Sequence, residues 1–275
     1  MDRAAGEEIM QINNGYGWTF DRVAEKYDKF RPGYPEELYD AVFEYAGKDR
    51  FGNALEIGIG AGQATLPVLK RAESFTAVEP GVSFCDMCRD KFRDFSGFSV
   101  INSSFEESEM CENSFDLALS ATAFHWVAEE AGYTKLFSAL KAGGVFARFA
   151  NRPYRDKGNL RLADEIDELY DRYYNRLYGY KKKVLREFDE DQAKSIADIA
   201  GKYGFADIEY RLFKRERVFS ADEYVSLIGT YSDHIAIRED VRKEFFAGIH
   251  DAIERHGGKI TIYDTIDLEL ARKPK

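Results

Sequence analysis

The stretch ALEIGIGAGQAT, from Ala54 to Thr65, constrains the fold of this chain more than any other. A run of strand-forming residues ends in three glycines at alternate positions, Gly58, Gly60 and Gly62, and a helix-like segment follows. Glycine permits backbone angles and close approaches that other residues exclude, so this pattern is typical of a strand, a tight turn and a helix around a nucleotide-like ligand. We therefore expect a ligand at the end of this strand.

Strand-like and helix-like segments alternate from the glycine turn to residue 151. The expected strands NALEIGI, SFTAVEP, FSVINSS, FDLALSA and VFARFAN are short and apolar, and helical stretches separate most of them. Such strands are typical of a parallel sheet covered on both faces, and right-handed crossovers make the sheet doubly wound. We predict an α/β, Rossmann-like doubly wound sheet of seven strands, mostly parallel, with one antiparallel strand near the C-terminus and a helical lid.

The pattern changes after Asn151. We expect residues 1–155 to form an N-terminal segment and the ligand-binding core, and 156–204 to form the helical lid. Residues 205–275 are expected to supply the closing strands of the core sheet with helices between them. The middle segment is assigned to a lid because its charged, tyrosine-rich helices have no obvious place in the sheet layers. We also expect the helix AEEAGYTKLFSALKAGG to end at its glycine pair.

The charge of the chain narrows the range of its partners. With 39 Lys and Arg against 49 Asp and Glu, the formal net charge is −10, so the field of the whole chain repels nucleic acid and anionic membranes. The N-terminal sequence has no apolar signal core, and no segment approaches membrane-spanning length. We expect a cytoplasmic protein, a monomer or homodimer, with no nucleic-acid or membrane partner.

Two acidic residues help to distinguish between S-adenosylmethionine and NAD as the ligand of the turn. Glu56 lies two residues before Gly58, where a carboxylate would repel a pyrophosphate but favour a ligand that carries a sulfonium and an ammonium. Gln63 stands where the dinucleotide pattern G-x-G-x-x-G needs its third glycine. Glu79 ends the second expected strand, where an acidic residue can bind both hydroxyls of a ribose. The combination favours S-adenosylmethionine over NAD.

The glycine-turn motif LEIGIGAGQAT, followed by AVEP, resembles motifs I and II of the class I S-adenosylmethionine-dependent methyltransferases. The segments VAEKYDKFRPGYPEELYD and FDLALSATAFHWV resemble a small-molecule subgroup that is similar to the trans-aconitate and quinone-biosynthesis methyltransferases, and HGGKITIYDTIDLELARK resembles its closing strand. The resemblance covers residues from about 20 to 151 and this closing strand. It implies an enzyme that binds S-adenosyl-L-methionine and methylates a small-molecule acceptor.

The resemblance implies cofactor-binding roles for residues of the first two motifs. Glu56 and the turn with Gly58, Gly60 and Gly62 would hold the methionine part of the cofactor. Glu79, followed by Pro80, would hold the ribose.

Residues of other segments complete the implied cofactor site. Ser104 and Phe105 would flank the adenine, although the sequence NSS replaces the Asp that the family often has there. The backbone around Ala121 would meet the amino group of the cofactor. Tyr27 and Arg31 would close over the site, with Arg31 as a partner for the cofactor carboxylate.

His125 and Trp126 follow the fourth expected strand, at the edge of the sheet where ligands bind in such folds. His125 is the candidate catalytic base. A phenol, amine or carbon acid could lose its proton to His125 or to a tyrosine, whereas a carboxylate acceptor would need no base. Trp126 and His234 are the candidate substrate contacts. The sequence does not choose among these acceptors.

Other interpretations remain open at this point. Cys85 and Cys88 have the spacing of a metal pair, but a zinc site needs four ligands and the other Cys and His residues lack a matching spacing, so we expect no metal. An S-adenosylmethionine-binding protein without catalysis, or an NAD-dependent oxidoreductase, would share the same strand and turn. A nucleic-acid methyltransferase is disfavoured by the charge.

Overall fold

The computed structural model describes residues 29–179 and 186–275, which fall into two compact units. The core unit comprises residues 32–152, 187–214 and 265–275. The helical unit comprises the described residues up to Arg31, residues from Pro153 to the 180–185 gap with Arg186, and residues 215–264. Tyr27, expected near the cofactor, lies outside the described residues.

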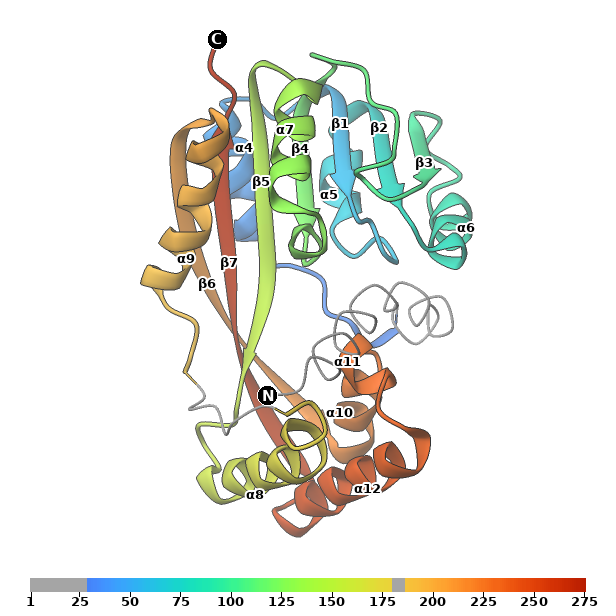
Figure 1. Cartoon of the computed structure of the whole chain (residues 1–275), viewed down its shortest axis with the longest axis vertical. Coiled ribbons are helices and arrows are strands. Elements are labelled where there is room, and N and C mark those ends of the chain that lie inside the picture. The colour runs from blue at the N-terminus through green and yellow to red at the C-terminus, as the bar shows by residue number, and fades with distance from the viewer. Residues whose placement is uncertain (1–28, 180–185) are drawn as a thin grey trace. The chain divides into compact units, whose positions relative to one another are not determined.

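The strands form one sheet of seven in the order β3-β2-β1-β4-β5-β7-β6, with β7 antiparallel, so the predicted fold class is confirmed (Figure 1). The boundary between the two units falls inside the three longest strands, β5, β6 and β7. The strand bounds are β1 Phe51–Ile57, β2 Ala72–Glu79, β3 Phe98–Asn102, β4 Phe115–Ala121, β5 Leu140–Tyr154, β6 Ala206–Ser220 and β7 Lys259–Arg272.

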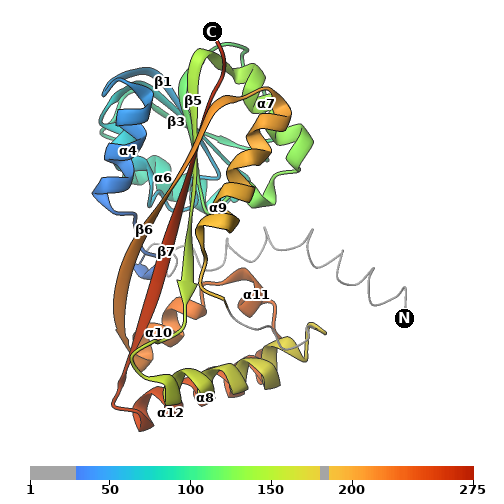
Figure 2. The same ribbon diagram turned by 90° about the vertical axis from the view of Figure 1, so that its left-hand side faces the viewer.

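Helices cover both faces of the sheet in the core unit (Figure 2). One face carries α4 (Glu36–Ala46), α5 (Thr65–Leu69) and α6 (Val82–Lys91). The other carries α7 (Glu129–Ala139) and the 3-10 helix η4 (Asp198–Tyr203), which follows α9 (Glu190–Ala197). The central strands β1 and β4 are therefore apolar on both sides, as a doubly covered parallel sheet requires.

The α7–β5 connection differs from the expectation. Helix α7 ends at Ala139, and the glycine pair lies inside β5 instead of ending the helix. Leu140 already pairs with Phe115 of β4, so ladder hydrogen bonds replace the last helical turn. Residues 141–144 bulge before the next pair, Val145 with Leu117, and Gly143 adopts a φ of +77° there.

The helical unit has its own apolar core. It contains α8 (Leu160–Tyr170), the π-helical turn η3 (Asp171–Asn175), α10 (Ala221–Ile228), α11 (Ser232–Ile235) and α12 (Glu239–Arg255). Helix α12 packs against α8 and α10 around a core that includes Leu162, Phe245 and Ile249. Ser220 and Glu223 form the expected capping box of α10.

The segment expected as a lid is divided between the two units. Helix α8 and η3 lie in the helical unit, whereas α9 and η4 belong to the core unit. Helices α9 and η4 belong to the core unit because Ala200 of η4 and Phe205 pack in the apolar core under α7. The ring of Tyr203 also stacks on that of Tyr133, with centroids 5.0 Å apart. Among the described residues, no helix is long and apolar enough to span a membrane.

Leu136 of α7 tests the packing of the core unit. Its side chain is fully buried, so we expect Leu136→Ala to lower the free energy of unfolding by about 2–5 kcal/mol through lost burial and the cavity left behind. Leu66→Ala on α5 is the control, because Leu66 is 39% exposed. Guanidinium denaturation measures both, and equal midpoints for the two variants would contradict this packing.

Candidate active site

The carboxyl ends of β1, β2 and β4 meet at one edge of the core sheet. The turn after β1 has left-handed backbone at all three glycines, with φ of +73° at Gly58, +53° at Gly60 and +77° at Gly62. A Cβ on Gly58 would lie 2.4 Å from the Cβ of Ala123, and one on Gly62 would lie 2.7 Å from the ring of Phe92. Backbone angle and space therefore both require glycine at these two positions.

Glu79, at the end of β2, holds the turn. Its Oε2 accepts a hydrogen bond from the backbone N–H of Gly60 at 3.0 Å, and its Oε1 accepts one from Gly81 at 2.9 Å. An acidic side chain at the end of the second strand is of the type that accepts hydrogen bonds from ribose hydroxyls. The side chain that the sequence assigned to the ribose thus lies beside the glycine turn.

Glu56 is completely buried at the end of β1. Its Oε2 accepts a hydrogen bond from Oγ1 of Thr65 at 2.7 Å, and its Oε1 has no hydrogen-bond partner among the described residues. Burial raises the pKa of this carboxyl to about 8, although the Thr65 hydroxyl opposes the shift. Glu56 is therefore mostly protonated at pH 7 without ligand, which the sequence analysis did not anticipate.

The loop after β3 differs in one detail from the expectation. Ser104 is partly accessible, but the ring of Phe105 is 3% exposed and packs in the core under α7. Only the main chain of Phe105 is thus left for a ligand. Pro80 is exposed at the end of β2, and its carbonyl oxygen accepts a hydrogen bond from Nδ2 of Asn102 at 2.9 Å.

The end of β4 contains a contact that the sequence analysis missed. Ala121 is partly accessible, and the next residue, Thr122, has a φ of +53°, a strained conformation for a β-branched residue. The hydroxyls of Thr122 and Tyr34 lie 2.7 Å apart, and the N–H of Thr122 donates to Phe149 O at 2.8 Å. No local sequence signal marks this conformation, because it depends on partners far along the chain.

His125 and Trp126 lie on a short 3-10 helix, η2 (Phe124–Trp126), beyond β4. Both are exposed, and their ring centroids are 4.9 Å apart. Although the residue is exposed, protein atoms around the imidazole partly desolvate it; this desolvation, followed by the positive charges of Arg152 and Arg148, lowers the pKa of His125. The ring is therefore neutral at pH 7, the form that can accept a proton.

Two predicted site residues lie in the helical unit. The guanidinium of Arg31 donates to Oγ1 of Thr230 at 3.0 Å and lies over the ring of Tyr231. His234 is 3% exposed, and its two ring nitrogens lie within hydrogen-bond distance of Tyr170 and Asp233. The interactions described for both residues are thus within their own unit.

Cys85 and Cys88 support the turn, a role that the sequence analysis missed. Both thiols are buried and free, and they donate to backbone carbonyls, Cys85 to Glu79 at 3.3 Å and Cys88 to Gly60 at 3.2 Å. Their spacing of three places them on one face of α6, which was the available signal. Within residues 29–179 and 186–275, no group of three or more potential ligands could hold a metal.

The residues at this edge fit S-adenosylmethionine. Among the described residues, the buried Oε1 of Glu56 has no hydrogen-bond partner, the glycine turn offers backbone that a side chain would block, and the Glu79 carboxylate lies beside that turn. A ligand with a ribose and an ammonium can use all three, whereas a pyrophosphate would lie close to the Glu79 carboxylate. When bound, this cofactor supplies an activated methyl group.

Comparison with known proteins agrees with this chemistry. Residues 55–147 match the model of a family described as methyltransferase domain. A relative from Bacillus mycoides, named an uncharacterized methyltransferase, is 30% identical over 183 residues, which are 59% of this chain and 84% of the relative. This chain belongs to the methyltransferase family. It is an S-adenosylmethionine-dependent methyltransferase.

Solved structures share the fold. A protein from Anaeromyxobacter dehalogenans, proposed to be a type II methyltransferase, has a TM-score of 0.60 and 23% identity and is matched over 89% of this chain and 99% of its own. Phosphoethanolamine N-methyltransferase 2 of Haemonchus contortus has a TM-score of 0.53 and 15% identity, over 93% of this chain and 58% of that one. At these identities the similarity supports the fold alone.

Gly58→Ala tests the turn of this methyltransferase. The added methyl meets Ala123 and a left-handed backbone, so we expect affinity for S-adenosylhomocysteine to fall at least about tenfold as the turn shifts. Gly47→Ala is the control, because Gly47 has a φ of +68° but no atom within 4 Å of the added methyl. Calorimetric titration compares them, and equal affinities in the two variants would refute the constraint.

Glu56→Gln tests the raised pKa. Glu56 keeps its proton in the folded state up to pH about 8, whereas in the unfolded chain it ionises near 4.5, so its contribution to stability is lost as pH rises between these values. We expect the parent to lose roughly 3 kcal/mol more than the variant between pH 5 and pH 8.

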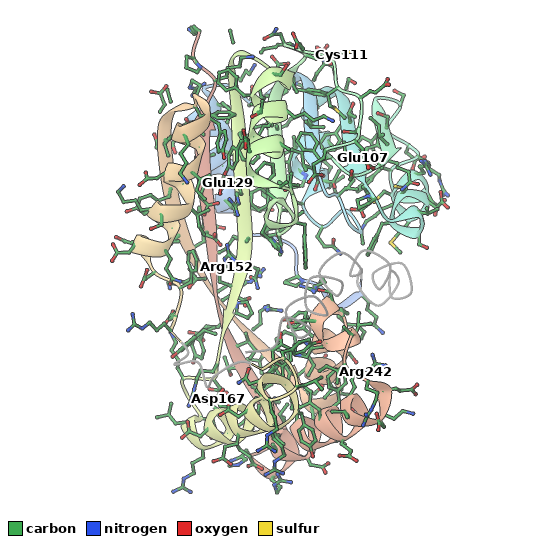
Figure 3. The ribbon with its side chains drawn as sticks, viewed as in Figure 1. Glu107, Cys111, Glu129, Arg152, Asp167 and Arg242 are labelled. Carbon is green, nitrogen blue, oxygen red and sulfur yellow. The ribbon has the colours of Figure 1, made fainter. Side chains whose placement is uncertain are left out.

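Denaturation midpoints measured at several pH values give this difference. Glu107→Gln is the control, because Glu107 is exposed on the loop after β3 (Figure 3). Parallel pH profiles for the parent and Glu56→Gln would show that Glu56 is ionised in the fold.

Proposed function

We propose that this methyltransferase transfers a methyl group from S-adenosylmethionine to a small-molecule acceptor. The observation that carries the proposal is the Glu79 carboxylate bound to the backbone of the glycine turn, which combines a ribose acceptor and a close-approach site at one edge of the sheet. Methyl transfer from a sulfonium is a displacement, so the protein mainly orients the two reactants and excludes water.

The proposed cofactor site consists of residues from the first four strands. Glu56 and the glycine turn are proposed to bind the methionine part, Glu79 and Pro80 the ribose, and Ser104, the main chain of Phe105 and Ala121 the rest. Tyr27 and Arg31 are also proposed to contact the cofactor; in the structure the guanidinium of Arg31 donates to Thr230.

The proposal of a small-molecule acceptor is supported by the charge of the chain and by a structural neighbour. The net charge of −10 disfavours nucleic acid, and one structural neighbour is named for methylation of phosphoethanolamine, a small molecule. We propose that His125 accepts a proton where the acceptor has one to lose, that Trp126 and His234 contact the acceptor, and that the segment 156–204 contributes to its selection. The exposed position of His125 just beyond β4 supports the first of these roles.

The proposal also covers the subgroup of the protein, its location and its oligomeric state. The segments VAEKYDKFRPGYPEELYD and FDLALSATAFHWV support a place in the subgroup similar to the trans-aconitate and quinone-biosynthesis methyltransferases. We also propose a cytoplasmic protein that is a monomer or a homodimer.

Calorimetric titration with S-adenosylmethionine, S-adenosylhomocysteine and NAD tests the cofactor site. We expect binding of the first two and none of NAD. Glu79→Gln replaces one carboxylate oxygen by an amide nitrogen that cannot accept a hydrogen bond, so affinity for S-adenosylhomocysteine should fall about 10- to 100-fold.

The matched control is Glu73→Gln, an exposed position at the other end of β2, which should bind like the parent. Binding of NAD alone would overturn the assignment of the turn. Unchanged affinity in Glu79→Gln would remove Glu79 from the ribose site.

A further inference from the structure

A polar cluster lies on one face of the core sheet, near the carboxyl end of β4. Arg148 and Arg152 are on β5, and Asp267 and Glu269 are on its neighbour β7, all within the core unit (Figure 3 labels Arg152). Phe146 and Ala271, next in alternation on the two strands, belong to the apolar core under α7, so the cluster continues that face. The function proposed above does not use these four residues.

One pair in the cluster is complete. Arg152 donates from Nε and Nη2 to the two oxygens of Asp267, at 2.9 and 3.0 Å, and Asp267 is fully buried. A bidentate pair of this kind is geometrically rigid. The two charges neutralise each other, so the pair forms a rigid boundary of the cluster.

Glu269 is the incomplete member. It is 5% exposed, and neither carboxyl oxygen meets a hydrogen-bond donor in the described part of the chain. Burial, followed by the negative charge of Asp267, raises the pKa of Glu269 to about 9, against the opposing charges of Arg148 and Arg152. Glu269 therefore holds a proton at neutral pH. A side-chain hydrogen bond to Asp267 uses that proton and contributes to the raised pKa, so a ligand oxygen would take the place of Asp267 as its acceptor, and no described donor reaches the Glu269 oxygens.

Arg148 is the second incomplete member. Its Nη1 donates to the hydroxyl of Tyr133 at 3.3 Å and its guanidinium lies 5.7 Å from the centre of the Phe124 ring, but it makes no ion pair with any described residue. Counting four residues along each antiparallel strand from the Lys273–Gly144 hydrogen bond places Glu269 opposite Arg148. A partly buried guanidinium thus faces a buried carboxyl without pairing with it.

The position of Arg148 connects the cluster to the reaction edge. Arg148 is paired with Ser120 in the β4–β5 ladder, one residue before Ala121. Its charge and that of Arg152 also lower the pKa of His125, the proposed base. The cluster therefore adjoins both the proposed cofactor site and the proposed base.

We propose that Arg148 and Glu269 form the recognition site for the methyl acceptor, and that this acceptor carries an anionic oxygen group; the inference rests on the proposed function. The two side chains come from neighbouring strands on one sheet face. Arg148 makes no ion pair with a described residue, and Glu269 carries a proton that a ligand oxygen can accept in place of Asp267. An anionic group can accept from the guanidinium of Arg148 with one oxygen and from the carboxyl of Glu269 with another or the same one.

The charge of the cluster favours an anion over an amine. Arg148 and Arg152 carry two positive charges, Asp267 carries one negative charge, and protonated Glu269 carries none. A cationic amine would therefore enter a field of net positive charge, which costs free energy in a partly buried site. A carboxylate, a phenolate and an enolate share the required chemistry.

A purely structural role explains these residues less well. A buried carboxyl that no donor reaches lowers stability relative to a satisfied or an apolar side chain. An aliphatic residue at position 269 would continue the apolar face formed by Phe146 and Ala271 without that cost. Natural proteins retain such groups where a ligand completes them.

Ligand-observed NMR titrations test the proposal on the full chain saturated with S-adenosylhomocysteine. The probes are benzoate, phenol and benzylamine, which separate a carboxylate, a phenol group and a cation on one ring. We expect benzoate, the anionic probe, to bind more tightly than the neutral phenol and the cationic benzylamine. Tighter binding of benzylamine, or no binding of benzoate at concentrations that leave the protein folded, would overturn the proposal.

Variants then assign the binding to these two residues. Arg148→Met should weaken binding of the preferred oxygen probe at least about tenfold, and Arg148→Lys should weaken it less, because the charge remains. The control is Arg93→Met, which removes one positive charge from a side chain that is 69% exposed and distant from Arg148 in the sequence. It should leave the affinity for the probe unchanged. Equal affinity in Arg148→Met and the parent would refute the role of Arg148.

Glu269 is tested by a matched pair. Glu269→Gln keeps a neutral side chain that donates a hydrogen bond and should bind within about threefold of the parent, whereas Glu269→Leu should lose at least about tenfold. Parent-like binding by Glu269→Leu would refute its role. The affinity of the parent protein for S-adenosylhomocysteine, measured separately, tests the proposed function. If the parent does not bind S-adenosylhomocysteine but binds benzoate through Arg148, the proposed function is contradicted and the anion site is not.

Discussion

The carboxylate of Glu79 joins two loops on which the rest of the site depends. It accepts one N–H from the turn after β1, at Gly60, and one from the start of the next segment, at Gly81. Both donors are backbone groups that would otherwise lack partners at the end of a buried sheet. The left-handed glycines make this geometry reachable, and the thiols of Cys85 and Cys88 secure the carbonyl side of the same two loops.

Buried carboxyl groups on β1 and β7 give the site its chemical character. Glu56 and Glu269 both have raised pKa values, to about 8 and about 9, and in both cases burial is the first cause. Each has an oxygen without a hydrogen-bond partner in the described part of the chain. Desolvated groups of this kind respond strongly to a charged ligand, because the low dielectric that keeps them neutral also strengthens any new interaction.

Much of the fold was predictable because local and global signals agree. The expected strands of the core match β1 to β4, and KITIYDTIDLELAR matches β7, since their apolar patterns are what a doubly covered sheet needs. The glycine pair after α7 misled the prediction, because pairing of Leu140 with Phe115 outweighs a local stop signal. Helices α9 and η4 were assigned to a lid because the sequence does not reveal that Phe205 fills the space under α7.

Sequence alone determined the fold class, the glycine turn and the acidic residues at the strand ends, because these depend on backbone freedom and on position along a strand. Tertiary structure decided the rest. It buried Glu56 and the ring of Phe105, placed the described contacts of Arg31 and His234 in the helical unit, and brought Arg148 into register with Ser120 and opposite Glu269. Burial and strand pairing join residues more than a hundred positions apart, and a carboxyl group acquires its protonation state only from the neighbours that such pairing provides.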